Sequence, residues 1–288
     1  MHYLLLSIIS STCIFLIFKQ FQKFGINNFQ AIVVNYITAA LCALFANGGY
    51  SGSIQSDCNE WIYIAIFTGV LFISMFNIIA ITTQKVGVSV ASVATKVSLI
   101  IPVIFAIYLY GDTLNILKVA GITIALLSVA LTFYKPGYKL SKSRKIIVLP
   151  IILFLGTGLL DTILKYTQER VISAEDFNRF STVLFAVAGT IGFVVAGLNI
   201  VICKTKFSIK SVYAGVLLGL PNYGSIYFLL QAFENSGMKS SVLFPVNNIS
   251  IVVFSALAAI VFFKEKVSKL NMLGILLALL SIAIISVA

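Results

Sequence analysis

The sequence predicts an all-α integral membrane protein with ten transmembrane helices, arranged as two inverted repeats of five helices. Hydrophobic residues make up 60% of the 288 residues and charged residues only 10%, whereas a soluble domain averages about 25% charged residues. The hydrophobic residues form continuous runs, and one stretch of the first half recurs in the second half. This composition excludes intrinsic disorder, a coiled coil, a disulfide scaffold and a single soluble domain.

Ten apolar runs account for most of the chain. None has the alternating pattern of a membrane β-strand, and a backbone in hydrocarbon must satisfy its hydrogen bonds within the segment, so each run is predicted to be a helix. The breaks between them are short, and the first run lacks the basic start and cleavage site of a signal peptide. The predicted helices span residues 3–20, 29–46, 61–83, 88–109, 115–134, 147–167, 177–201, 211–232, 239–262 and 269–287.

Basic residues lie mainly in the odd-numbered connections between these runs. The odd connections carry 14 Lys and Arg, the even ones carry five, and Lys96 lies inside a run. The positive-inside rule therefore places the odd connections in the cytoplasm and both termini outside a plasma membrane, the inner membrane in bacteria. Most of the net charge of +11 is then explained by loop residues that set the orientation of the chain at the anionic cytoplasmic leaflet. The expected partner is the lipid bilayer, and no nucleic acid is expected.

The repeat is most evident in two ten-residue segments. Residues 121–130 and 274–283 are identical at seven of ten positions, at a shift of 153. Because five helices are an odd number, the second copy enters the membrane from the opposite side, which gives an inverted repeat of 1–140 and 141–288. Further matches, at shifts of 146 to 153, are Asp112 with Glu265, Gly69 with Gly219, Gly87 with Gly237 and Lys19 with Lys165.

The junction Phe262–Ile275 joins an apolar helix, an acidic residue, a short basic turn and a glycine, and it resembles the junction before the last helix of EamA-type transporters. Tyr110–Gly121 resembles the same junction in the first half, and Pro102 and Pro245 resemble the prolines of the fourth helix of each half. This resemblance to the drug/metabolite transporter superfamily covers essentially the whole chain. It implies two inverted five-helix halves and a cavity built from the first, third, fourth, sixth, eighth and ninth helices.

Lys96 and Asp161 lie well inside apolar runs, where a charge costs about 2.5–3.5 kcal/mol at the helix centre. Lys96 lies deep in the fourth run, and Asp161 and Lys165 share one face of the sixth. We expect them to face a cavity, with Lys96 pairing with Asp161 and Asp161 as a candidate proton-coupling carboxylate. The alternatives are a local Asp161–Lys165 ion pair and a Lys96 side chain that extends to the membrane interface.

Uncharged polar residues extend the candidate cavity. Prolines free backbone carbonyls that can line a cavity, whereas buried amides also serve as hydrogen bonds between packed helices. The candidates are Asn77, Asn222, Gln231, Asn247 and Asn248, together with the helix-breaking Pro102, Pro221 and Pro245.

These observations predict a secondary transporter that moves a small metabolite by alternating access. Lys96 favours an anionic or zwitterionic solute such as an amino acid, with a proton as a candidate coupling ion. The alternatives are an exporter or flippase for a drug or lipid-linked substrate, for which 23 Phe and 12 Tyr could line the cavity, and a membrane enzyme or assembly factor. His2 is the only histidine, which removes a histidine-based triad, a His-rich metal site and bis-histidine haem. We therefore expect a protein that is not an enzyme and holds no metal or cofactor. The fifth and tenth helices are a candidate homodimer surface.

Overall fold

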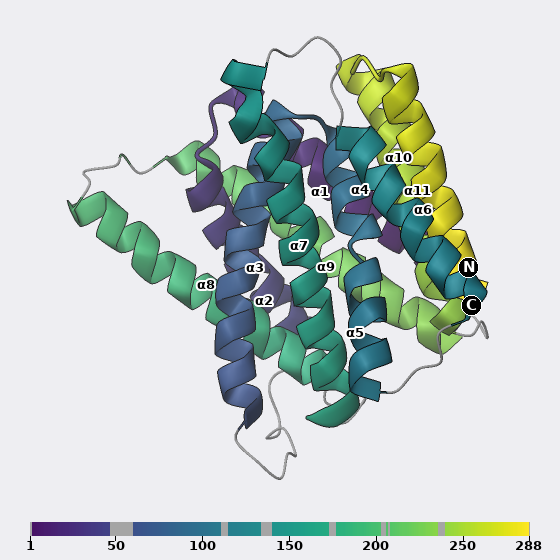
Figure 1. The fold of residues 1–288 in the computed structure, drawn as a ribbon. Helices are drawn as coiled ribbons and strands as arrows, with labels where there is room; N and C mark the ends of the chain where they lie inside the picture. The colour runs from purple at the N-terminus through teal and green to yellow at the C-terminus, as the bar shows by residue number, and fades with distance from the viewer. Residues whose placement is uncertain are drawn as a thin grey trace. The chain divides into compact units, whose positions relative to one another are not determined.

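A computed structural model describes residues 2–46, 60–110, 115–133, 140–172, 177–202, 206, 208–235 and 240–287 (Figure 1). Within these residues the chain folds into helices and contains no strand, which confirms the predicted all-α class. The helices are α1 His2–Phe24, α2 Asn28–Ala46, α3 Glu60–Lys85, α4 Val88–Val97, α5 Ile100–Tyr110, α6 Ile116–Phe133, α7 Leu140–Arg170, α8 Phe177–Ile202, α9 Ile209–Asn235, α10 Ser240–Phe263 and α11 Lys269–Val287.

The helices match the predicted membrane spans closely. Among the described residues, nine helical segments are long and apolar enough to cross a bilayer, and Ile116–Thr132 adds a shorter apolar helix. The predicted helices coincide with these segments, with α4 and α5 together forming the fourth; α7 differs most, because it begins at Leu140 rather than at residue 147. By the length and composition of its helices, the chain is an integral membrane protein.

The fourth predicted helix is divided into α4 and α5, with a turn at Ser98 and Leu99. Pro102 has no N–H to donate to the Ser98 carbonyl, four residues earlier. The Ile101 N–H donates to that carbonyl instead, at 2.9 Å, which tightens the chain into a three-residue turn. The Ser98 hydroxyl donates to the Thr95 carbonyl at 2.7 Å, so it supplies a partner where the helix is interrupted.

The chain divides into two compact units, and each draws on both halves of the sequence. These units differ from the predicted repeats 1–140 and 141–288. The division of the sequence into those two repeats stays a prediction. Unit 1 consists of Met1–Lys19, Ile78–Leu159 and Ser225–Ala288, and unit 2 consists of Gln20–Asn77 and Leu160–Gly224.

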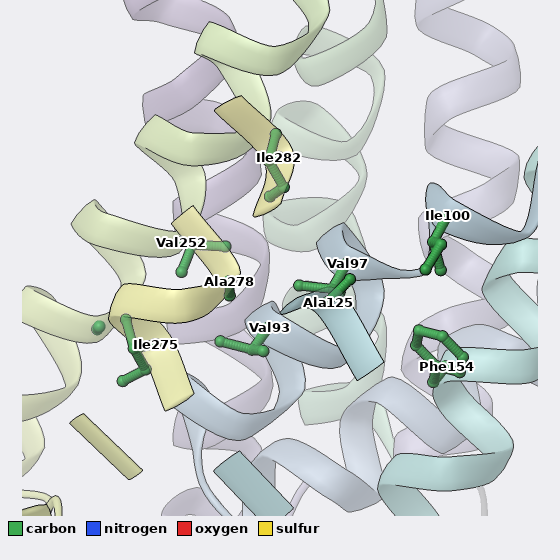
Figure 2. Packing of buried hydrophobic residues seen from close by; sticks show 10 residues of the cluster. Val93, Val97, Ile100, Ala125, Phe154, Val252, Ile275, Ala278 and Ile282 are labelled. Carbon is green, nitrogen blue, oxygen red and sulfur yellow. The ribbon is translucent and has the colours of Figure 1, made fainter. Parts of the chain in front are cut away.

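In unit 1, α11 packs along α6, and α10 packs against α4 and α11 (Figure 1). Glycines permit the close approach of α6 and α11, as is typical of helices in membranes. A Cβ atom on Gly274 would lie 2.6 Å from the backbone nitrogen of Thr132, and one on Gly121 would lie 2.6 Å from the Ile285 side chain. The apolar core beside this pair is shown in Figure 2 and includes Val93, Val97, Ile100, Ala125, Phe154, Val252, Ala256, Ile275, Ala278 and Ile282.

In unit 2, α2 packs against α8 and α9. Gly215 and Gly219 of α9 form a small-xxx-small face, and Cβ atoms there would lie 2.5 Å and 2.8 Å from backbone oxygens of α2. The fully buried Tyr36 of α2 packs among aromatic rings of α3 and α8, with its ring centroid 5.2 Å from that of Phe76 and 6.2 Å from that of Phe185. Both units are therefore held by close helix packing.

Candidate functional site

The predicted site residues are distributed over both units. Because each unit is described by itself, the Lys96–Asp161 ion pair stays a prediction. Unit 1 holds Lys96, Gln231, Asn247, Asn248, Pro102 and Pro245, whereas unit 2 holds Asn77, Asp161, Lys165, Asn222 and Pro221.

Lys96 lies in the last turn of α4 and is half-buried. It follows Val88, the first residue of α4, by eight residues, which is roughly 12 Å along a helix and hence near the middle of a hydrocarbon layer about 30 Å thick. The C-terminal end of a helix carries partial negative charge, so the interruption after Val97 gives the ammonium group a favourable position within the span. The division of the fourth helix therefore helps to stabilise a cation at membrane depth.

Asn247 lies on α10, which packs against α4. Its side chain is 3% exposed, and no hydrogen-bond donor to its Oδ1 atom is found among the described residues. An amide oxygen buried without a donor costs about 1–3 kcal/mol, so this position suits a bound water or a donor group of a solute. The neighbouring Asn248 is half-buried, and Pro245 lies in the same helix.

Two other amide candidates are bound within their own helices. The Asn77 amide nitrogen donates to the Ile73 carbonyl at 2.8 Å, and the Gln231 Oε1 atom accepts a bond of 3.2 Å from Asn235. Hydropathy does not reveal such local bonds, which compete with contacts to a solute.

The candidates on α7 and α9 differ in burial. Asp161 is exposed on α7, and Lys165, one turn later on the same face, is half-buried. Asn222 is buried, next to Pro221 within α9. Asp161 is thus the more accessible of the two α7 candidates.

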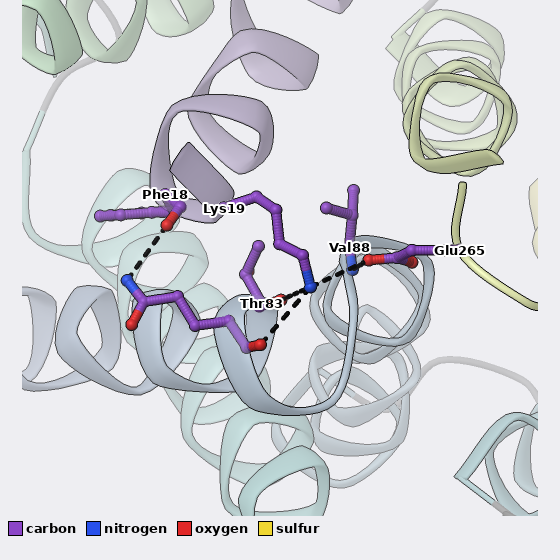
Figure 3. A network of polar contacts seen from close by, with 6 residues as sticks. Phe18, Lys19, Thr83, Val88 and Glu265 are labelled. Carbon is purple, nitrogen blue, oxygen red and sulfur yellow. Dashed lines mark hydrogen bonds and ion pairs between the residues drawn. The ribbon is translucent and has the colours of Figure 1, made fainter. Parts of the chain in front are cut away.

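The most extensive polar network described in unit 1 lies at the ends of α1, α3 and α10 and at the start of α4 (Figure 3). We call it the Lys19–Glu265 junction; it comprises Lys19, Thr83, Gln84, Val88 and Glu265. The Lys19 ammonium lies 3.3 Å from Glu265 Oε1 and donates to the backbone oxygens of Thr83 at 3.2 Å and Gln84 at 3.4 Å. An ammonium has three N–H donors, and this site offers three acceptors.

The Glu265 carboxylate also caps α4. Its Oε1 atom accepts the Val88 backbone N–H at 2.9 Å, where the N-cap residue Gly87 has no side chain to do so. A carboxylate at a helix N-terminus is stabilising, by about 0.3–1 kcal/mol in exposed positions and more when partly buried. The Gln84 side chain completes the network by donating to the Phe18 carbonyl at 3.0 Å.

Two unusual backbone conformations make this geometry possible. Lys264 has a φ of +51°, and the Glu265 N–H bonds back to the Ala259 carbonyl at 3.1 Å, so the chain turns sharply at the end of α10. Gly87 has a φ of +138°, and a Cβ there would lie 2.9 Å from Glu265 Oε2. A left-handed lysine costs about 1–2 kcal/mol, and such strain tends to occur at functional positions.

In the sequence, Lys19, Gly87 and Glu265 stand out only as positions that match between the two halves. Nothing in the sequence identified them as a site. The available signal was an acidic residue directly after an apolar helix, followed by basic residues. That pattern does not reveal the partners, because Lys19 lies far from Glu265 in the sequence.

Comparisons with known proteins agree with the fold and the resemblance. Residues 1–134 match the model of the EamA-like transporter family, which confirms the resemblance for the first half of the sequence. The chain is 27% identical over 289 residues to an uncharacterized protein of Haemophilus influenzae, covering 98% of this chain and 96% of that protein. A protein of known crystal structure shares the fold, with a TM-score of 0.57 and 14% identity, covering 96% of this chain and 97% of the other.

Proposed function

We propose that this protein is a secondary transporter that moves a small anionic or zwitterionic metabolite by alternating access between two inverted halves. The match of residues 1–134 to a family of transporters supports transport as the activity. The observation that carries the mechanism is a pair of reciprocal contacts between α6 and α11.

These contacts follow the sequence repeat. Gly121 of α6 lies against Ile285 of α11, and Gly274 of α11 lies against Thr132 of α6. The shift of 153 that relates Gly121 to Gly274 also relates Thr132 to Ile285. When residue i contacts j and their counterparts make the same contact in exchange, the packing follows a two-fold axis. This reciprocity supports inverted halves, the usual architecture of secondary transporters.

The substrate class follows from the polar groups on α4 and α10. Lys96 supplies a cation near the middle of the span and suits a carboxylate, while the buried Asn247 oxygen accepts a hydrogen bond from an ammonium or hydroxyl group. An amino acid offers both a carboxylate and an ammonium. A drug-like or lipid-linked substrate needs neither group, so the polarity of these helices favours the small metabolite.

The proposed orientation places the odd connections in the cytoplasm, as the excess of basic residues indicates. The Lys19–Glu265 junction lies at the first, third and ninth connections, all on that side. Cysteines placed in α1 and α11 and labelled from one side of sealed vesicles would test the orientation.

Transport itself is tested in proteoliposomes. A panel of amino acids and organic acids is assayed for uptake and efflux, with and without a pH gradient, for the parent protein and for Lys96→Met. The matched control is Lys269→Met, which removes an exposed lysine at the start of α11. We expect about a tenfold loss of transport for Lys96→Met, partial activity for Lys96→Arg and parental activity for the control. Transport by Lys96→Met equal to that of Lys269→Met would refute the role of Lys96.

Proton coupling is tested separately. If Asp161 carries the coupled proton, Asp161→Asn should abolish the pH change that substrate drives in the vesicles. If Asp161→Asn vesicles show the same pH change as those with the parent protein, Asp161 has no part in the mechanism. If no solute of the panel moves under any gradient, the proposed function itself fails.

A further inference from the structure

We propose that the Lys19–Glu265 junction is a latch that holds the odd-connection side of the transporter closed and that must break each time this side opens. The inference rests on the proposed function, because it assigns the junction a role in alternating access. Its basis is that one carboxylate oxygen, Glu265 Oε1, binds both the Lys19 ammonium and the N-terminus of α4.

The junction joins the two predicted halves. Lys19, Gln84 and Val88 belong to the first half, whereas Glu265 belongs to the second. When inverted halves rock against each other, one end of the protein opens while the other closes. A bond at that end between segments that move apart therefore has to break whenever the end opens.

The chemistry of the junction suits repeated breaking and re-forming. The side chains of Lys19 and Glu265 are 21% and 15% exposed, so water can reach both partners and replace the bonds when they separate. The contact is made by the ends of the Lys19 and Glu265 side chains, together with one backbone N–H and two backbone carbonyls. Such bonds contribute enough to bias an equilibrium between two states without fixing it permanently.

A second polar contact between the halves has a different character. The Asn271 amide of α11 donates to the carbonyls of Leu131 and Thr132 at the end of α6, at 3.2 Å and 2.7 Å. There the helices are also packed closely along their lengths, with Gly274 at one end and Gly121 at the other. We assign α6 and α11 to a fixed pair that does not separate, which makes Asn271 a matched control for the latch.

The geometry at Gly87 supports a built contact rather than a chance approach. Gly87 has a φ that side chains rarely adopt, and the carboxylate occupies the space of its missing Cβ. The turn at Lys264 directs Glu265 toward this position. Two backbone conformations in distant segments are therefore adapted to a single carboxylate.

The test measures opening without any substrate. Ser89, in the first turn of α4, is 4% exposed and directly follows Val88, whose N–H binds Glu265. It is replaced by cysteine in a full-length protein whose four native cysteines have been changed to serine, and its reaction with a water-soluble maleimide is timed in detergent. The latch variants are Lys19→Met, Glu265→Gln and Glu265→Ala. The controls are Asn271→Ala and Lys23→Met, which removes an exposed lysine of the same helix end.

We expect labelling about fivefold faster in Lys19→Met and Glu265→Gln, which lose the ion pair, and about tenfold faster in Glu265→Ala, which also loses the cap of α4. The controls should label at the parental rate. Thermal unfolding midpoints identify any variant that labels faster because it is misfolded.

Two results would overturn the latch: parental labelling in all three latch variants, or an equal increase in Asn271→Ala. The outcome is separable from the proposed function. If the labelling pattern is as expected but no solute is transported, the junction controls opening and the transport proposal fails. If solute is transported but labelling does not respond, only the latch fails.

Discussion

Replacing Gly274 with alanine should destabilise the protein far more than the same replacement at Gly121, although the repeat makes the two positions equivalent. The structure shows different surroundings for the added methyl group. At Gly274 it would meet Thr132 N at 2.6 Å and Ser128 O at 3.0 Å, both backbone atoms of α6. At Gly121 it would first meet Ile285 Cγ1 at 2.6 Å, an atom of a side chain that can rotate.

The expected sizes follow from these contacts. Backbone atoms of a packed helix cannot move aside individually, so Gly274→Ala must push α6 and α11 apart, and overpacking of this kind costs about 1–3 kcal/mol. Alanine returns up to about 1 kcal/mol of helix propensity, which leaves a net loss of up to about 2 kcal/mol. At Gly121 a change of the Ile285 rotamer costs about 0.5–1.5 kcal/mol, so the net effect there is close to zero.

The measurement is thermal unfolding of the purified protein in detergent. Gly197→Ala is the control, because a Cβ at this exposed α8 position has nothing within 4 Å and should be neutral or slightly stabilising. The unfolding midpoint should be highest for Gly197→Ala, lower for Gly121→Ala and lowest for Gly274→Ala. If Gly274→Ala unfolds at the temperature of the control, α6 and α11 do not pack this closely, and the reciprocal contacts that support the inverted halves are wrong.

Three further predictions concern Gly87, Gln30 and Pro102. Gly87→Ala should lower the free energy of unfolding by about 2 kcal/mol or more, because the new methyl group clashes with Glu265 in addition to the strained φ. Gly25→Ala, with a φ of +63° and open space around the Cβ, should lower it by about 1 kcal/mol, and equal losses in thermal unfolding would argue against the close carboxylate contact. Gln30→Leu should lower stability by about 1–3 kcal/mol, because the Gln30 side chain bonds to the backbone of residues 206 and 208, while the exposed Gln22→Leu should have little effect. Pro102→Ala should slow amide hydrogen exchange at residues 98–103, since the new N–H can extend the helix; unchanged exchange would mean that the proline does not cause the break.

The helical fold could be predicted because hydrocarbon leaves the backbone no other way to satisfy its hydrogen bonds within a segment. The interruption between α4 and α5 was not predicted, although Pro102 had been recognised as helix-breaking. Pro150 and Pro221 lie inside the continuous helices α7 and α9, so proline alone does not decide the outcome. Beside Pro102, hydroxyl groups of Thr95 and Ser98 bond to backbone carbonyls of the preceding turn, and this local bonding favours the break there.

The candidate site was harder to predict, because a polar side chain in a helix can bond to its own helix, to another helix or to a solute. Hydropathy does not distinguish these partners. Asn77 and Asn247 both read as polar residues in apolar runs, yet the Asn77 amide bonds to its own helix and the Asn247 oxygen has no donor among the described residues. The Lys19–Glu265 contact depends on two turns that bring distant segments together. Neither turn has a sequence pattern that specifies its partner.

The structure also distinguishes two lysines that the sequence assigns to the same role. By position in the sequence, Lys19 and Lys23 both count as odd-connection cations that set the topology. In the structure they differ: Lys19 is bound by three oxygens at the junction, whereas Lys23 is exposed, with its ammonium 5.8 Å from the Phe24 ring centre. Removing either lysine takes one positive charge from the same helix end, so the effect on membrane orientation should be the same. A difference between Lys19→Met and Lys23→Met in the rate of opening therefore measures the junction alone, separated from the topological role that the two lysines share.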